Sequence, residues 1–346
     1  MEDEIKKFIK VWLTSTICLC YCYYISSKIP KGFLRFLSIS PILYLFITLP
    51  LNLSSFHLGG PTIFFLVWLS TFKLILFSLN QPPLFPLPNT VFHFISIASL
   101  PINPTNPTNP KTTLLPKKPN LPLVFFKVVI LVVLICCYEY REHMHPHLIL
   151  FLYCIHMYLG IELVLALSAA PVRTVFGFEI EPQFNEPYLS TSLQDFWGRR
   201  WNLTVTRTLR PTVYNPVRHA VSSYVGTKFA TSIATLATFV VSGLMHEVIY
   251  YYLARVSPTW EVTWFFVLHG VCTSVEVAVK KIVLRRGWRL HRAVSGLITV
   301  AFLAVTGNWL FFPQLLRNGV DRKGIEEYEV IMDFVKDKLV QLHLFS

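Results

Sequence analysis

Long apolar runs, separated by shorter polar or basic stretches, recur along most of the chain. A run of about 20 mostly apolar residues is long enough to cross the hydrocarbon core of a membrane as a helix. By length and flanking residues we expect eight spans, over residues 11–27, 36–51, 61–79, 121–138, 148–170, 228–253, 262–279 and 293–312. The pattern therefore predicts an all-α membrane protein, a bundle of about eight transmembrane helices that forms one domain over residues 1–346.

Composition supports this class. Of the 346 residues, 53% are hydrophobic and 14% are charged, and the mean hydropathy is +0.51, whereas soluble domains carry about 25% charged residues. The formal net charge of +12 would suit nucleic acid, but most basic residues flank apolar runs, where they set membrane topology. We therefore expect membrane lipids and no nucleic acid as partners. The seven cysteines lie inside apolar runs and indicate neither a disulfide framework nor a zinc site.

The loops between the spans differ in charge. If eight spans alternate, one set of loops holds nearly all the Lys and Arg, while the opposite set, leaving out the termini, contains only Arg141 and Arg255. The positive-inside rule places the basic set in the cytosol. Residues 171–225 belong to that set, so we expect them to face the cytosol.

Residues 80–122 are rich in proline, and each proline lacks the backbone donor that a helix needs. We interpret the stretch as an extended linker. Residues 91–100 within it are apolar but too short to cross, so we expect them on the membrane surface.

Polar chemistry is concentrated first in the cytosolic segment 171–225. Its sequence Ser-Leu-Gln-Asp-Phe-Trp-Gly-Arg-Arg-Trp-Asn ends at Asn202. Large apolar side chains recur at intervals of one to four residues, which predicts an amphipathic helix at the interface with its Trp rings at headgroup depth. The apolar set is Phe196, Trp197, Trp201, Val205 and Leu209. An anchoring helix without chemistry fits this pattern equally well. The arginines of this segment suit phosphate groups, such as those of anionic lipid headgroups.

The second polar feature is the pair His246 and Glu247 in the middle of an apolar run. Ionisable residues at membrane depth are costly and usually serve a reaction or a transport pathway. A structural hydrogen bond between helices is the alternative for the His. A zinc protease is excluded because Tyr250 stands where HExxH has its second His. The alternating histidines 143, 145 and 147 are interpreted as loop residues, and no metal site is expected.

The block that ends at Asn202, followed some forty residues later by Ser-Gly-Leu-Met-His-Glu, resembles the plant wax synthase branch of the membrane-bound O-acyltransferases. Further similar stretches are residues 72–77, 261–272, 276–281 and 309–313, so the resemblance involves nearly the whole chain. It implies that His246 is the catalytic histidine and that Asn202 is the second active-site residue. Further candidates for substrate binding are Asp195, Trp197, Arg199, Arg200, Trp201, Glu247 and His269.

The resemblance implies transfer of a fatty acyl group from acyl-CoA to a long-chain fatty alcohol, giving a wax ester and free CoA. Neutral imidazole is suited to removing the hydroxyl proton. A side-chain amide can stabilise the oxyanion or position the histidine, and the sequence leaves both roles of Asn202 open. Acyl-CoA is a co-substrate, and no cofactor is expected. The expected location is the endoplasmic reticulum membrane.

Two rival functions stay open at this point. A sterol instead of a fatty alcohol would make the protein a sterol O-acyltransferase, because the sequence does not reveal the shape of the acceptor pocket. A proton-coupled transporter would use His246 and Glu247 as a relay, although repeated halves, frequent in transporters, are not found. The sequence indicates neither an obligate protein partner nor an oligomeric state.

Overall fold

The computed structural model describes residues 1–102, 121–176, 182–285 and 290–344. Within these ranges the regular structure is helical, and eight helical stretches are long and apolar enough to span a membrane. They are Glu2–Lys28, Phe33–Asn52, Phe56–Ser78, Pro122–His143, Pro146–Thr174, Leu203–Ala254, Glu261–Val283 and Arg292–Phe311. The predicted fold class and the eight expected spans are confirmed. Most boundaries shift by a few residues, but the first stretch begins at Glu2 instead of residue 11, and the sixth at Leu203 instead of residue 228.

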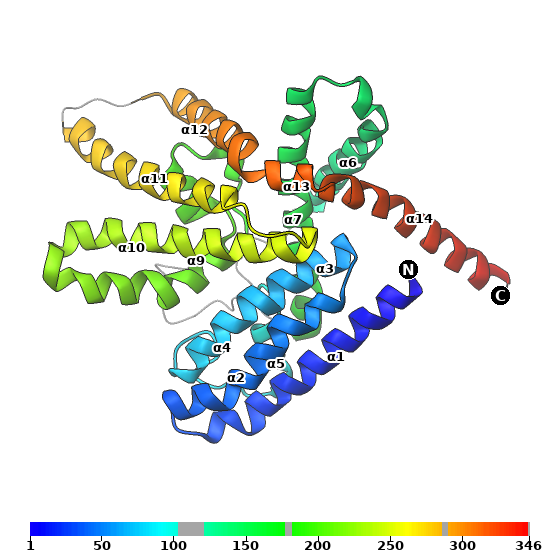
Figure 1. The fold of residues 1–346 in the computed structure, drawn as a ribbon, viewed down its shortest axis with the longest axis horizontal. Coiled ribbons are helices and arrows are strands. Elements are labelled where there is room, and N and C mark those ends of the chain that lie inside the picture. Colours follow the sequence, from blue (N-terminus) through cyan, green and yellow to red (C-terminus); the bar gives the residue numbers. More distant parts are fainter. Residues whose placement is uncertain (103–120, 177–181, 286–289, 345–346) are drawn as a thin grey trace.

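Figure 1 shows the order of the helices along the chain. They are α1 (Glu2–Tyr24), α2 (Phe33–Thr48), α3 (Phe56–Ile63), α4 (Thr71–Ser78), α5 (Val91–Ser99), α6 (Leu121–Cys137), α7 (Pro146–Phe176), α8 (Leu193–Asp195), α9 (Leu203–Leu209), α10 (Asn215–Ala254), α11 (Glu261–Arg285), α12 (Arg292–Thr306), α13 (Pro313–Arg317) and α14 (Val320–Leu344). A π-helical turn, Phe64–Ser70, joins α3 to α4 in one continuous span.

The first third of the chain forms the best-buried part of the bundle. Side chains of α1, α2, α4 and α5 share one apolar core, which includes Leu19, Ile39, Phe46 and Phe77. The α3–α4 span lies inside, and nearly all residues of its π-helical turn are buried. This span also packs on α10, which in turn packs along α11 (Figure 1). The α3–α4 span therefore connects the N-terminal core to the helices that carry the polar motifs.

Helix α5 corrects one expectation. Residues 91–100 do not lie on the surface, because Phe94 and Ile97 are buried among α1, α2 and the α3–α4 span. The physical reason is Lys73, whose Nζ donates to the carbonyls of Ile97 at 2.6 Å and Leu100 at 2.7 Å. A helix end leaves carbonyls without partners, and a buried ammonium group satisfies them here. The proline-rich stretch 103–120 lies outside the described residues.

The loops meet at two faces, as alternating spans require. At one face, Arg35 donates to the carbonyls of Ile29 at 2.9 Å and Phe77 at 3.1 Å, which joins the loop before α2 to the end of α4. At the other, Arg255 donates to the carbonyl of Leu51 at 2.9 Å, which joins the end of α10 to the end of α2. Each of these contacts joins two loops that the eight-span order places on the same face.

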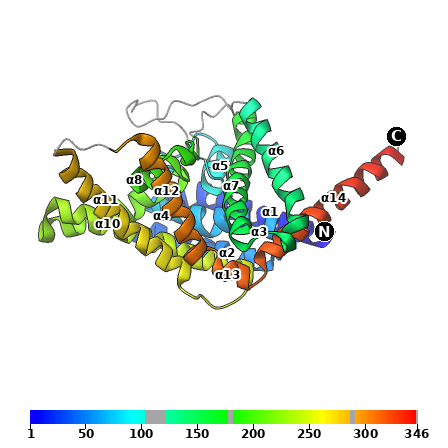
Figure 2. The ribbon, with the colours of Figure 1, turned by 90° about the horizontal axis from the view of Figure 1, so that it is seen from above.

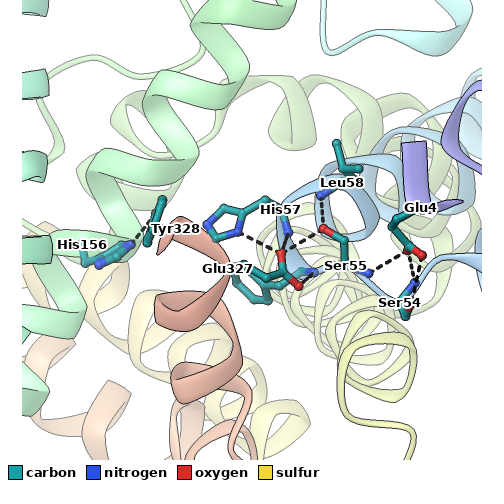
Figure 3. A network of polar contacts seen from close by, with 9 residues as sticks. Glu4, Ser54, Ser55, His57, Leu58, His156, Glu327 and Tyr328 are labelled. Carbon is teal, nitrogen blue, oxygen red and sulfur yellow. Dashed lines mark hydrogen bonds and ion pairs between the residues drawn. The ribbon is translucent and has the colours of Figure 1, made fainter. Parts of the chain in front are cut away.

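The charged C-terminal helix α14 is tied to this second face by Glu327 (Figure 3). Its carboxylate lies at the N-terminus of α3, where it accepts from the Ser55 hydroxyl at 2.9 Å, the Phe56 amide at 2.6 Å and His57 Nδ1 at 3.0 Å. Burial acts against the charged form, but these donors, the His57 ring above all, lower the pKa of Glu327 to about 2. Beyond this contact α14 projects away from the bundle (Figure 2).

Candidate active site

The polar segment before α10 is a broken helix, which corrects the expected continuous interfacial helix. Helix α8 passes into a π-helical turn, Phe196–Arg200, then stops at Trp201 and restarts as α9. The break occurs because Asn202 has left-handed backbone angles, φ 36° and ψ 66°. The Trp201 ring is not aligned along an interface; it stacks on Phe196 and meets Phe184 edge-on, both at 5.2 Å between centroids. The aromatic side chains therefore pack inward.

Asn202 itself caps α9. Its side-chain Oδ1 accepts from the Val205 amide at 3.4 Å, a capping role for which Asn is among the best residues. Asn also tolerates the left-handed conformation better than most residues. Within the described part of the chain, its side-chain NH₂ group donates no hydrogen bond, so the amide retains a donor for another molecule.

The two neighbouring arginines differ. Arg200 is fixed in place: its Nε donates to Asp195 at 2.7 Å, and its Nη1 donates to the carbonyls of Asn185 and Glu186 at 3.1 and 3.2 Å. Arg199 is exposed. Asp195 and Arg200 thus hold the turn together, and Arg199 is the member of the set that is open to a ligand from outside.

Trp197 and His269 form a buried connection between helices. The Trp197 indole N–H donates to His269 Nδ1 at 3.1 Å, and His269 Nε2 lies 2.9 Å from the Thr306 hydroxyl. That hydroxyl already donates to the Phe302 carbonyl at 2.7 Å, so it accepts from His269. Both ring nitrogens of His269 are therefore used within the protein, and His269 joins the broken segment to α11 and α12.

His246 is bound differently. Its Nδ1 lies 2.7 Å from the Ser242 carbonyl, and a carbonyl only accepts, so Nδ1 carries the proton. Nε2 of the neutral ring then has its lone pair free to accept. Aromatic rings surround the imidazole: Phe266 at 4.3 Å, Trp68 at 5.1 Å and Phe311 at 5.8 Å between centroids. The imidazole is therefore an acceptor packed among apolar rings.

Glu247 points to the neighbouring helix. It is 3% exposed, and its Oε1 accepts from the Thr263 amide and hydroxyl at 3.3 and 3.2 Å. The helices are close here, since a Cβ built on Gly243 would lie 3.0 Å from Thr263 Cα. Glu247 therefore joins α10 to α11, and its Oε2 is buried with no partner among the described residues.

Aromatic contacts connect the two motifs that the sequence singled out. The Trp197 ring lies 5.7 Å from that of Phe266, which lies against His246. Asn202 and His246, both described, share no hydrogen bond. Sequence reasoning missed Trp68 and Phe311, because an aromatic residue in an apolar span gives no local signal of its place.

A hollow of about 310 Å³ lies away from His246, between the end of α6 and α14, beside Tyr138, Glu142 and Tyr328. Among the described residues, no three His, Cys, Asp or Glu side chains are gathered as a metal site requires. The part of the chain that the structure describes therefore gives His246 no metal cluster as a partner.

Comparison with known proteins finds relatives over nearly the whole length of the chain. Residues 180–268, which contain both motifs, match the Membrane bound O-acyl transferase family. A "Long-chain-alcohol O-fatty-acyltransferase" of Simmondsia chinensis is 49% identical over 348 residues, covering 99% of each chain. Two proteins of Arabidopsis thaliana are 48% identical: the "Probable long-chain-alcohol O-fatty-acyltransferase 1", covering 97% of this chain and 98% of the relative, and the "Probable long-chain-alcohol O-fatty-acyltransferase 3", covering 99% of each.

Proposed function

The chain belongs to the long-chain-alcohol O-fatty-acyltransferases of the membrane-bound O-acyltransferase family, and we propose that it transfers a fatty acyl group from acyl-CoA to a long-chain fatty alcohol. The products are a wax ester and free CoA. The observation that carries the proposal is the state of His246, whose Nδ1–H bonds to the Ser242 carbonyl and leaves Nε2 as an acceptor. A neutral imidazole of this kind is a general base.

In the proposed reaction the alcohol oxygen attacks the thioester carbonyl carbon while His246 Nε2 takes the hydroxyl proton. The carbonyl oxygen becomes an oxyanion in a tetrahedral intermediate. The carbon–sulfur bond then breaks, the carbonyl re-forms in the ester, and the imidazolium returns its proton to the CoA sulfur. The protein forms no covalent bond in this sequence. The thioester itself supplies the activated acyl group, so we propose that no cofactor or metal takes part.

We assign the unused amide N–H of Asn202 to the substrate. Developing negative charge on a carbonyl oxygen is stabilised by donors held in place before the reaction. The αL cap geometry fixes the Asn202 side chain at the start of α9. Asp195, Arg200, Trp197 and Trp201 act by holding the broken segment in shape, as their contacts indicate.

For orientation, we propose that the broken segment faces the cytosol in the endoplasmic reticulum membrane, where acyl-CoA is available. The loops at that face carry most of the Lys and Arg between the spans. Exposed Arg199 is then placed to pair with a CoA phosphate. Anionic lipid headgroups are the other partner that suits it.

The test is expression in cells that lack neutral-lipid acyltransferases, fed separately with fatty alcohols, sterols or diacylglycerol. Mass spectrometry of the lipids is expected to find wax esters only when fatty alcohol is supplied and the protein is present. Steryl esters in the sterol-fed cells, without wax esters in the others, would show that the acceptor is a sterol.

A further inference from the structure

Trp68 has a buried donor that is left unpaired in the part of the chain that the structure describes. Its side chain is 1% exposed, and its indole N–H has no hydrogen-bond partner among the described residues. Leaving a buried donor unpaired destabilises the folded protein. Trp12, in contrast, donates its indole N–H to the Thr62 hydroxyl at 3.3 Å. The unpaired N–H of Trp68 is therefore a candidate to donate a hydrogen bond to a bound molecule.

The position of Trp68 is set by the π-helical turn Phe64–Ser70. Turns of this kind occur often at functional sites. The widened turn is supported by the Ser70 hydroxyl, which donates to the Phe65 carbonyl at 2.8 Å and lies 2.9 Å from the Ala98 carbonyl. Phe64 meets the indole edge-on at 5.5 Å between centroids. The turn thus holds the indole in one orientation.

Trp68 also packs directly against His246. The two rings meet edge-on, at an interplanar angle of 82° and with 5.1 Å between centroids. Among the described residues, each ring has a nitrogen without a partner: the indole N–H of Trp68 is unpaired, and the imidazole of His246 keeps a lone pair at Nε2. One donor and one acceptor therefore belong to two rings in direct contact.

We propose that the Trp68 N–H donates a hydrogen bond to the acyl carbonyl oxygen and stabilises the oxyanion that forms there. This inference rests on the proposed acyl transfer with His246 as base. In the attack step the alcohol gives its proton to His246 Nε2 and its oxygen bonds to the carbonyl carbon, while the electron pair of the carbonyl moves to its oxygen. The attacking oxygen and the oxyanion are bonded to the same carbon, so adjacent rings are suited to bind both.

The experiment compares purified wild-type protein with Trp68→Phe in detergent, measuring ester formation and thermal stability. Trp68→Phe removes no protein hydrogen bond but leaves a void in the core, so a lowered melting temperature is expected and rates are compared per folded protein. The kcat is expected to fall by about 100- to 1,000-fold, the usual effect of losing one oxyanion donor, with KM changed only a few-fold. The matched control is Trp12→Phe, which removes a paired donor: it lowers the melting temperature and leaves kcat near that of the wild type.

A second variant separates the N–H from the shape of the ring. Replacing Trp68 with 3-benzothienylalanine, in which sulfur takes the place of the N–H, keeps the bicyclic ring and is expected to lose kcat as Trp68→Phe does. A kcat within threefold of the wild type for this variant would overturn the proposal. Failure of the proposed function would look different, because the wild-type protein would then make no ester in the same assay.

Discussion

Asn202 offers a test in which folding and catalysis separate. Its Oδ1 caps α9, its backbone is left-handed, and its NH₂ is free for the substrate. Asn202→Ala removes the cap and the NH₂ donor, and it places in the left-handed conformation a residue that tolerates it poorly. Loss of the cap costs about 1 kcal/mol, and a left-handed non-glycine residue costs a further 1–2 kcal/mol, roughly. Ala is thus expected to destabilise the protein by about 2–3 kcal/mol, so loss of activity in this variant alone does not identify the amide as catalytic.

Asn202→Gly and Asn202→Asp avoid this confusion. Gly adopts the left-handed conformation freely and weakens a cap by only a few tenths of a kcal/mol, roughly. Asp keeps the cap and tolerates the conformation, but has no amide donor. Both variants are expected to melt close to the wild type, while kcat falls by about 100- to 1,000-fold.

The assay is ester formation by purified protein, with thermal unfolding measured on the same sample. If Asn202→Gly forms ester at the wild-type rate, the amide has no part in the reaction and the broken segment has only a structural role. If Asn202→Ala alone loses activity, in proportion to its loss of folded protein, the reasoning is equally refuted.

Three further predictions concern other contacts. Arg199→Ala is expected to raise KM for acyl-CoA without lowering the melting temperature. Arg200→Ala is expected to lower the melting temperature, because Arg200 is fixed by Asp195. If the two variants change KM and the melting temperature to the same extent, the assignment is contradicted. Because the pKa of Glu327 is about 2, against an ordinary 4.5, its carboxylate stabilises the fold above about pH 4.5 and loses this effect as pH falls toward 2. The difference in melting temperature between wild type and Glu327→Gln is therefore expected to shrink from pH 6 to pH 3, and a constant difference would refute it. Asn202 begins an Asn-Leu-Thr sequon and is expected to stay unglycosylated, because its segment is proposed to face the cytosol. Eight spans place the end of the chain on the opposite side, so a glycosylation tag added after Ser346 is expected to be modified. A glycan on Asn202 and none on the tag would overturn the orientation.

The fold was predictable because each span is encoded locally. A run such as residues 61–79 is apolar over its whole length, and no distant residue is needed to identify it. The docking of α5 was not predictable in this way. It depends on Lys73 reaching the Ile97 carbonyl, 24 residues away, and a lysine in an apolar run does not reveal its partner.

The candidate site was predictable in part for the same reason. His246 and Glu247 are visible as ionisable residues within a span. The break at Asn202 is not, since the apolar spacing of its neighbours fits a continuous helix equally well, and only the backbone geometry distinguishes the two. The contrast between His246 and His269 likewise depends on partners from other helices, such as Thr306. The roles assigned to these residues stay predictions.

The proposed reaction depends on the Nε2 of His246 acting as the general base. The most direct measurement is ester and free CoA produced by purified His246→Ala and His246→Gln in detergent, where no transmembrane gradient exists to drive transport. Wild-type protein is expected to release CoA and ester in equal amounts, and both variants to lose about 100- to 10,000-fold in rate, the usual contribution of a general base. Both variants are expected to be as abundant and as well folded as the wild type. If His246→Ala retains most of the wild-type rate, His246 is not the base.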